Sequence, residues 1–136
     1  MNLYFTLDVV PRSKKNSMVV GKRKDGSTYV GQNEKYQAFE KKVINLVEEQ
    51  DLQLHINTLI NVKVHFYCES RRKIDITNLL GAIDDALVKA GVIEDDNRNI
   101  IAAHDGSRVY WDKEHPRIEI WIEDLKEEYQ EWNTKK

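Results

Sequence analysis

The sequence has a single cysteine, Cys68, among its 136 residues, and it has no long hydrophobic run. One thiol cannot form an internal disulfide, and it cannot build a structural zinc site from thiolates. No apolar stretch approaches the roughly 20 residues that a membrane-spanning helix requires. The opening residues MNLYFTLDVV lack the basic and then apolar pattern of a signal peptide. These absences predict a protein of a reducing, cytoplasmic compartment without a membrane segment.

An overall excess of one charge is also absent, because 21 Lys and Arg residues face 23 Asp and Glu residues. The charges are nevertheless unevenly placed. Residues 1–73 carry 13 basic and 8 acidic side chains, whereas residues 74–136 carry 8 basic and 15 acidic ones. A basic half joined to an acidic half suits a metal-dependent nuclease, in which phosphates lie beside carboxylates. Ordinary surface variation with an acidic tail is the alternative explanation.

Hydrophobic patterning predicts one α+β domain over residues 1–136, a two-layer sandwich of a mixed β-sheet and two main helices. Strands are expected at residues 2–10, 17–20, 28–30, 59–69, 98–104, 107–112 and 118–122, with turns at Asp25-Gly26 and Asp105-Gly106. Helices are expected at residues 34–50, after Asn33 as N-cap, and between Thr77 and Gly91. The polar tail, residues 124–136, is expected to be helical or partly disordered.

The segment from Asp75 to Asn97, DITNLLGAIDDALVKAGVIEDDN, places acidic groups at both ends of one short helix. Asp75 precedes the helix, and Glu94, Asp95 and Asp96 follow it. Carboxylates gathered at one place repel each other, so the usual reason to gather them is a hard divalent cation with oxygen ligands. The segment therefore predicts a metal site at which the two acidic ends converge.

The polar side chains of this helix fall on separate sides. Asn78, Gly81 and Asp85 share one side of the helical wheel, whereas Asp84 points elsewhere. Asp85 therefore joins Asp75, at the helix start, as a candidate ligand. Glycine costs a helix up to about 1 kcal/mol relative to alanine. Gly81 accordingly indicates either a close approach of backbone or ligand, or a lack of space for a side chain.

Basic residues run directly into the first acid of the segment, because the sequence SRRKID ends at Asp75. Two further lysines occupy an earlier polar loop. Such side chains suit the phosphate backbone of DNA, in a sequence-independent and salt-sensitive role. The candidate DNA-binding residues are Lys14, Lys15, Arg71, Arg72, Lys73 and Asn78.

Each candidate also has a plainer explanation. Asp75 lies where a helix cap would lie, and Asp95 and Asp96 are typical turn residues. Asp85 has a lysine four residues further on, which would make a weak surface pair. His65 alternates with core positions of a strand and is interpreted as a surface or hydrogen-bonded histidine rather than a ligand.

The ordered motif in residues 75–97 resembles that of the RusA family of Holliday junction resolvases, small nucleases of bacteria and their phages. Its parts are an acid at a strand end, Asn-Leu at a helix start, Asp-Ala-Leu in the helix, a Gly and a paired Asp-Asp. The opening strand, the loop PRSKKNS and the tyrosine-bearing helix NEKYQAFEKKV agree with the family as well. The resemblance extends over residues 3–122 and implies a bacterial or phage-encoded nuclease.

Carried over by position, the resemblance implies that Asp75 and Asp96 are catalytic carboxylates. Asn78, Asp85 and Asp95 also match motif positions. The implied cofactor is Mg²⁺, with Mn²⁺ able to substitute. The expected metal ligands are Asp75, Asp85, Asp95 and Asp96, and the expected catalytic residues are Asp75, Asp85, Asp96 and Lys73.

Two positions depart from the family pattern. Thr77 stands where the well-studied members have a second aspartate, and Gly81 stands where they have a catalytic lysine. The helical wheel nominates Asp85 for the missing carboxylate. Candidates for the missing cation are Lys14, Lys15 and Lys73.

The expected substrate is a four-way DNA junction, whose approximate two-fold symmetry and two cuts favour a homodimer. Trp121, Tyr129 and Trp132 are candidate contributors to its interface. Two other functions stay open. Thr77 and Gly81 motivate a catalytically weak or inactive junction-binding protein. The same chemistry would also serve a phage nuclease for other branched DNA.

Overall fold

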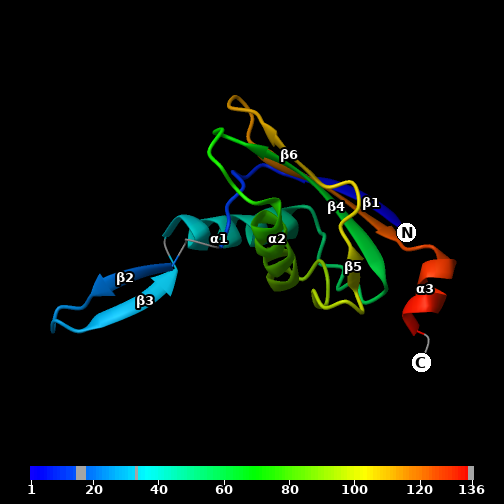
Figure 1. Cartoon of the computed structure of the whole chain (residues 1–136), viewed down its shortest axis with the longest axis horizontal. Helices are drawn as coiled ribbons and strands as arrows, with labels where there is room; N and C mark the ends of the chain where they lie inside the picture. The colour runs from blue at the N-terminus through cyan, green and yellow to red at the C-terminus, as the bar shows by residue number, and fades with distance from the viewer. Residues whose placement is uncertain (15–17, 33, 135–136) are drawn as a thin grey trace.

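The computed structural model describes residues 1–14, 18–32 and 34–134, and it shows a mixed β-sheet with two helices on one face (Figure 1). The elements are β1 (Asn2–Leu7), β2 (Met18–Lys22), β3 (Thr28–Gln32), α1 (Glu34–Glu49), β4 (Ile60–Cys68), α2 (Ile76–Ala90), β5 (Ile101–Ala103), β6 (Arg108–Trp111), β7 (Arg117–Asp124) and α3 (Glu127–Thr134). The expected α+β fold is confirmed. Asn33, the expected N-cap of α1, and Lys15 lie outside the described residues.

The five-stranded sheet has the order β1-β7-β4-β5, with β6 also paired to β4. β1, β7 and β4 are antiparallel neighbours, whereas β5 and β6 run parallel to β4. Alternation sends Val62, Val64 and Phe66 of β4 into the core, where α1 and α2 cover them. The buried apolar residues of the two helices are Tyr36, Phe39, Val43, Val47, Leu79, Ala82, Ile83, Ala86, Leu87 and Ala90.

β5 and β6 lie one after the other along the same edge of β4. In the gap between them, side chains supply hydrogen-bond partners for the backbone of β4. His104 Nδ1 lies 2.8 Å from the carbonyl oxygen of Val62. The amide of Val64 donates to the hydroxyl of Ser107 at 3.0 Å. Buried backbone groups need such partners wherever a strand ladder is interrupted. The two expected strands are therefore present, and the segment between them is tied to β4 by side chains.

Asn61 makes further hydrogen bonds to the segment between β5 and β6. Its side-chain amide donates to the carbonyl of Asp105 at 3.2 Å, and its oxygen accepts the amide of Asp105 at 2.7 Å. Alternation placed Asn61 on the polar face of β4, yet the residue is only 2 % exposed. The cause is that the loop following β5 folds over it.

β2 and β3 form a separate two-stranded sheet, which Figure 1 shows extending away from the main sheet and its helices. Gly26 has φ +92°, and the Asp25 carboxylate accepts the amide of Ser27 at 2.9 Å, which closes the turn. The predicted hairpin is confirmed. Its exposed tip carries Lys22, Arg23 and Lys24.

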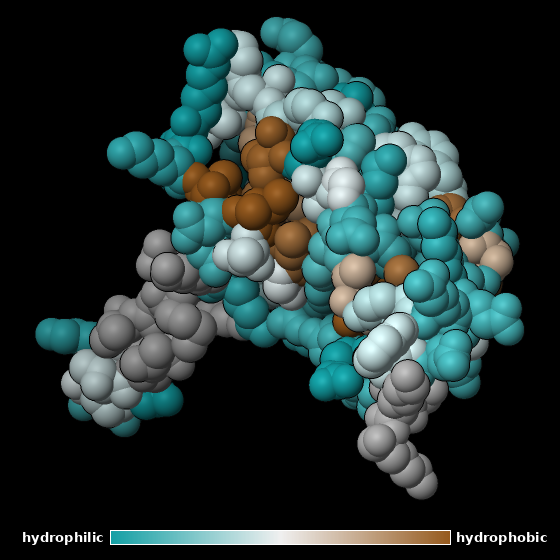
Figure 2. Space-filling view, turned by 45° about the vertical axis from the view of Figure 1, so that its right-hand side comes forward, coloured by the Kyte–Doolittle hydropathy of each residue, from teal (hydrophilic) through white to brown (hydrophobic). Residues whose placement is uncertain are grey.

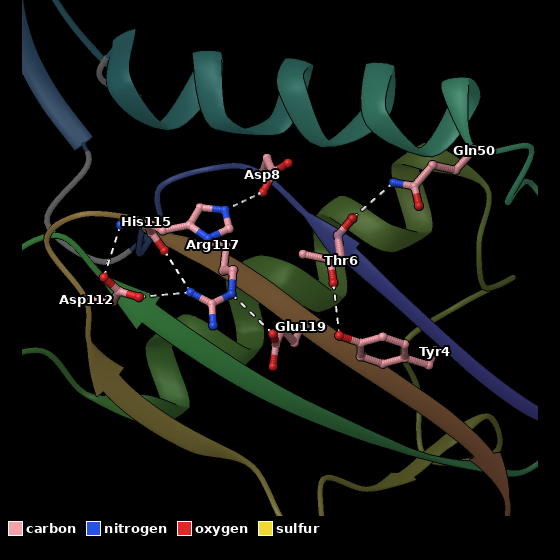
Figure 3. Close-up of polar contacts among 8 residues, drawn as sticks. All are labelled: Tyr4, Thr6, Asp8, Gln50, Asp112, His115, Arg117 and Glu119. Carbon is pink, nitrogen blue, oxygen red and sulfur yellow. Dashed lines mark hydrogen bonds and ion pairs between the residues drawn. The ribbon is translucent and has the colours of Figure 1, made fainter.

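A cluster of ion pairs fixes the start of β7 (Figure 3). The Arg117 guanidinium lies 3.0 Å from Asp112 Oδ2 and 3.2 Å from Glu119 Oε2. His115 Nε2 lies 3.0 Å from Asp8 Oδ1, beyond the end of β1. The turn before β7 is thereby held against the neighbouring strand.

Aromatic rings stack on the sheet face opposite the helices. The His65 ring meets Trp121 and Tyr110 edge-on, with centroids 4.7 and 5.4 Å apart. His65 Nε2 lies 3.1 Å from the carbonyl oxygen of Gly106. The interpretation of His65 as a hydrogen-bonded histidine is confirmed, and Trp121 is half-buried rather than exposed.

Within the tail, Glu127–Thr134 form α3, whereas Asp124 still belongs to β7. Tyr129 and Trp132 of α3 are exposed. No helix within the described part of the chain combines the length and the apolar character needed to cross a membrane.

Two glycines of the α2 region should respond in opposite ways to alanine. Gly91 has φ +86° and a Cβ there would lie 3.1 Å from His55 Cε1, so we expect Gly91→Ala to destabilise the fold by about 1 kcal/mol or more. Gly81 lies in the exposed helix interior, so Gly81→Ala should stabilise it by up to about 1 kcal/mol. Urea unfolding followed by circular dichroism measures both, and equal effects would contradict this account.

Candidate active site

The start of α2 positions Asp75. Asp75 is the N-cap residue, and its carbonyl accepts the amides of Asn78 and Leu79, which begins the helix. Its side chain makes no capping hydrogen bond. The carboxylate instead accepts the side-chain amide of Asn78 at 3.2 Å, on the exposed surface. The side chain of Asp75 is therefore not occupied by the cap role that the sequence also allowed.

Asp85, in the middle of α2, is paired with a lysine from the loop after β1. Lys14 Nζ lies 3.1 Å from Asp85 Oδ2, although 71 residues separate them, and it also lies over the ring of Tyr36. The alternative pairing with Lys89 is wrong, because Lys89 reaches Glu40 of α1 at 2.7 Å. Among the three candidate cations, Lys14 is thus the one whose contact with Asp85 is described.

Asp96 returns to the side of Asp85 because the chain reverses at Gly91. The left-handed backbone of Gly91 ends α2, and Ile93 then pairs with Ile56 in an isolated parallel bridge. Partial burial and then the neighbouring carboxyl of Asp85 raise the pKa of Asp96. Two acids separated by a helix end and a loop therefore stand within electrostatic contact.

Asp95 serves the loop itself. Its carboxylate accepts the amide of Asp96 at 2.7 Å and the side-chain amide of Asn97 at 3.1 Å. Asn97 in turn accepts the amide of Asn99 at 2.9 Å. The turn role proposed for Asp95 is thus present, and it fixes the backbone that carries Asp96.

Asp84 and His104 were not among the candidates, yet they form the most buried polar contact near the site. Asp84 is 7 % exposed, and its Oδ2 lies 2.8 Å from His104 Nε2. Burial raises the pKa of Asp84, and His104 opposes that shift. Burial alone would lower the pKa of His104, but Asp84 outweighs it and raises the pKa overall. The signal was a carboxylate at the edge of the apolar stripe, which requires a buried partner.

The length of α2 separates Asp75 from Asp85. Ten residues of helix rise about 15 Å, whereas oxygens that bind one Mg²⁺ lie about 2 Å from it. One ion cannot therefore contact both carboxylates within a protomer. The described residues bring together Asp85, Asp96 and Lys14, and they leave Asp75 with Asn78 at the helix start.

Gly81 is exposed, and a Cβ built there would meet nothing within 4 Å. The explanation from a lack of space is therefore wrong, and no backbone within the described chain approaches this glycine closely. The missing side chain leaves open space on the side of α2 that faces solvent.

The basic run before Asp75 is exposed. Arg71, Arg72 and Lys73 all lie at the surface, and the guanidinium of Arg71 stacks over the ring of Trp111, 4.0 Å from its centroid. This contact leaves the charge of Arg71 accessible while it orients the side chain.

The carboxylates suit a divalent cation but do not form a complete cage. Within residues 1–14, 18–32 and 34–134, no three acidic, imidazole or thiol groups are gathered closely enough to hold a metal. Mg²⁺ usually binds one or two carboxylates and completes its shell with waters and substrate phosphate. The crowded pair Asp85 and Asp96 fits that need, and the donor chemistry is that of a hard cation.

We expect Asp96→Asn to stabilise the metal-free protein at pH 7. A carboxyl whose pKa is raised on folding binds more protons in the folded state, so the folded state loses stability as pH rises through that window. The gain should shrink as pH falls toward about 4, the ordinary range of aspartate. Thermal unfolding across this pH range measures it, with Asp51→Asn as an exposed control. A lower melting point for Asp96→Asn at pH 7 would contradict this reading.

One comparison with known proteins assigns the chain to a family. A family model described as "Endodeoxyribonuclease RusA" matches residues 8–123, from the end of β1 almost to the end of β7. No curated protein matches the chain. The matched region contains Asp75, all of α2 and the loop that carries Asp96. Because the match covers most of the sequence, the chain belongs to the RusA endodeoxyribonuclease family.

Proposed function

We propose that this chain is a Mg²⁺-dependent, structure-specific endodeoxyribonuclease that resolves four-way DNA junctions. The observation that carries the proposal is the approach of Asp96 to Asp85, with Lys14 on the same carboxylate. Carboxylates crowded in this way favour a bound cation. Family membership implies endodeoxyribonuclease chemistry and supports the same conclusion.

In this proposal Asp85 and Asp96 are the protein's ligands to the cation, and Asp95 orients Asp96 through its amide. When bound, Mg²⁺ supplies neutralisation of the phosphoryl oxygens and activation of a water. Asp95 is proposed to act on the cation indirectly, by holding the loop that carries Asp96. Both of its oxygens accept hydrogen bonds within that loop.

Lys14 takes the place of the family's lysine. The family position is Gly81, on the side of the helical wheel that also carries Asp85, and Lys14 reaches Asp85 from another segment. An ammonium at this place can contact a phosphate oxygen that a carboxylate would otherwise repel. Lys14 is therefore proposed to position the scissile phosphate beside Asp85 and Asp96.

Asp75 acts at the helix start, where Asn78 holds its carboxylate and Lys73 precedes it by two residues. The resemblance assigns Asp75 a catalytic role. Because ten residues of helix rise about 15 Å, we propose that Asp75 acts apart from the cation that Asp85 and Asp96 would share within a protomer. Asp75 would act on a different oxygen or ion, or beside the carboxylates of a second protomer.

The DNA backbone would be held by exposed basic residues. Arg71, Arg72 and Lys73 lead directly to Asp75, and the tip of the β2–β3 hairpin adds Lys22, Arg23 and Lys24. Contacts of this kind are sequence-independent and salt-sensitive. Lys15 belongs to the same proposal, although it lies outside the described residues.

A homodimer is the proposed assembly, because two strands of a two-fold junction must be cut. Exposed apolar residues supply interface surface. Val109 and Trp111 are 38 % and 49 % exposed, and their pairing with Phe66 and Cys68 places them on the helix side of the sheet, at its edge. Figure 2 shows a hydrophobic patch on the face in view, with smaller hydrophobic spots apart from it. Trp121, one earlier candidate, fits less well because neighbouring rings cover it.

A catalytically weak or inactive junction-binding protein is the second candidate. The empty space at Gly81 and the hydroxyl of Thr77 favour it, since two groups of the family pattern are missing. A nuclease for other branched DNA keeps the same chemistry and differs only in substrate. A panel of labelled flaps, forks and four-way junctions separates these readings.

We expect a labelled four-way junction to be cleaved with Mg²⁺ or Mn²⁺ and to stay intact with EDTA. Asp75→Asn and Asp96→Asn should each lower cleavage by about 100-fold or more, since Asp96 is a proposed cation ligand and the family resemblance gives Asp75 a catalytic role. Junction binding in a gel-shift assay should persist, because the basic residues are unchanged. Cleavage by either variant at the wild-type rate would reject that residue's assignment. Absence of metal-dependent cleavage by the wild type would favour the binding protein.

The role given to Lys14 predicts rescue from α2. Lys14→Met should lower the cleavage rate by about tenfold or more, because one charged contact to phosphate is lost. Adding Gly81→Lys to that variant should restore part of the rate, since a Cβ at this exposed position has nothing within 4 Å. Lys22→Met, at the hairpin tip, is the matched control and should change only binding and its salt dependence. A double variant no better than Lys14→Met would reject the replacement.

A further inference from the structure

We propose that Asp84 and His104 form a buried positioning pair that fixes the orientation of α2 and thereby aims Asp85 at Asp96. This inference rests on the proposed function for its catalytic consequence. Its structural part, the placing of two carboxylates for one cation, stands on the contacts of the pair itself. Neither residue is proposed to touch the cation or the DNA.

His104 joins the sheet to the helix through both ring nitrogens. Its Nδ1 lies 2.8 Å from the carbonyl oxygen of Val62 on β4, and its Nε2 lies 2.8 Å from Asp84 Oδ2 on α2. The ring occupies the gap between β5 and β6, where β4 has no strand partner. The sheet edge therefore sets where the ring lies, and the ring sets where Asp84 lies.

The backbone under His104 is itself fixed. Asn61 makes two hydrogen bonds to the backbone of Asp105, the next residue along the chain. Ser107 accepts the amide of Val64 two residues further on. Because the backbone of His104 is held against β4, its ring can fix the place of Asp84. An imidazole on a mobile loop could not do so.

A hydrogen bond adds to apolar packing a direction that helps to define the rotation of a helix about its axis, because apolar attraction itself is non-directional. The Asp84–His104 contact is directional, and a buried carboxylate left without it would carry a large desolvation cost. Asp84 Oδ1 has no hydrogen-bond partner among the described residues. The contact of Oδ2 with His104 is therefore the interaction that offsets the burial of this carboxylate. The helix is therefore held where this one bond is made.

The pair acts on the site through the next residue. Asp85 follows Asp84 directly on α2, and a rotation that relieved Asp84 would swing Asp85 away from Lys14 and Asp96. Loss of the pair should thus disturb metal ligation more than it disturbs DNA binding.

The test uses Asp84→Ala, His104→Ala and Asp84→Asn in the full chain. The amide of an asparagine can donate to Nε2 of a neutral His104 whose Nδ1 donates to Val62, so Asp84→Asn keeps the contact without the charge. The first readout is Mn²⁺ binding without DNA, by calorimetry or electron paramagnetic resonance. We expect Asp84→Ala and His104→Ala to weaken binding by about tenfold, and Asp84→Asn to bind as the wild type.

The second readout is junction cleavage. The two alanine variants should lower kcat, whereas KM for the junction should stay near the wild-type value, because the basic residues are untouched. Ile120→Val, in the core of β7, is the control for lost stability, and it should leave Mn²⁺ affinity unchanged at a comparably lowered melting point.

Mn²⁺ affinities of the alanine variants equal to that of Ile120→Val would show that the pair only stabilises the fold, and would overturn the inference. Weak binding by Asp84→Asn would overturn it as well, since charge rather than position would then matter. Absence of Mn²⁺ binding by the wild type would have the same consequence. A wild type that binds Mn²⁺ but cleaves no branched DNA would instead defeat the proposed function, and the titration would still decide the role of the pair.

Discussion

The mutual repulsion of carboxylates around α2 is the constraint to which the rest of the site is adjusted. Asp84, Asp85 and Asp96 come from one helix and the loop that follows it, and they stand within electrostatic reach of one another. Two of the three have a described cationic or histidine partner, in Lys14 and His104. Partial burial and then the neighbouring carboxyl of Asp85 raise the pKa of Asp96, so the ionised form of Asp96 lowers the stability of the folded state. Stability given up at one spot in this way is typical of a functional site.

The sheet supports α2 and so holds the neighbouring carboxylates in place despite their repulsion. β4 is paired along both edges, and the gap between β5 and β6 is filled by side chains that bind its backbone. Among the described residues, the buried side chains of α2 are apolar apart from Asp84, so the helix packs closely on the sheet. Close packing of α2 on the sheet therefore holds Asp85 near Asp96 although the two carboxylates repel each other.

Much of this arrangement could be predicted, and the exceptions have physical reasons. Periodicity identified α1, α2, β4 and the β2–β3 hairpin, because each has a regular apolar pattern or a clear turn. The wheel identified Asp85 as separate from Asp84, but it could not show that Asp84 meets a histidine twenty residues later. The choice of Lys14 depends on a contact across 71 residues, which no local pattern reports. Alternation describes the strand and not the loop above it, so it could not show that the loop after β5 covers Asn61 on the outer face of β4.

The β2–β3 hairpin has one more consequence. It forms its own two-stranded sheet and carries three cationic side chains at a tip far from the hydrophobic core. A two-stranded ribbon adds little to the stability of the domain on its own. Changes in its length or charge can therefore accumulate without threatening folding, so the DNA contacts proposed for the hairpin would be able to change independently of the carboxylates on α2.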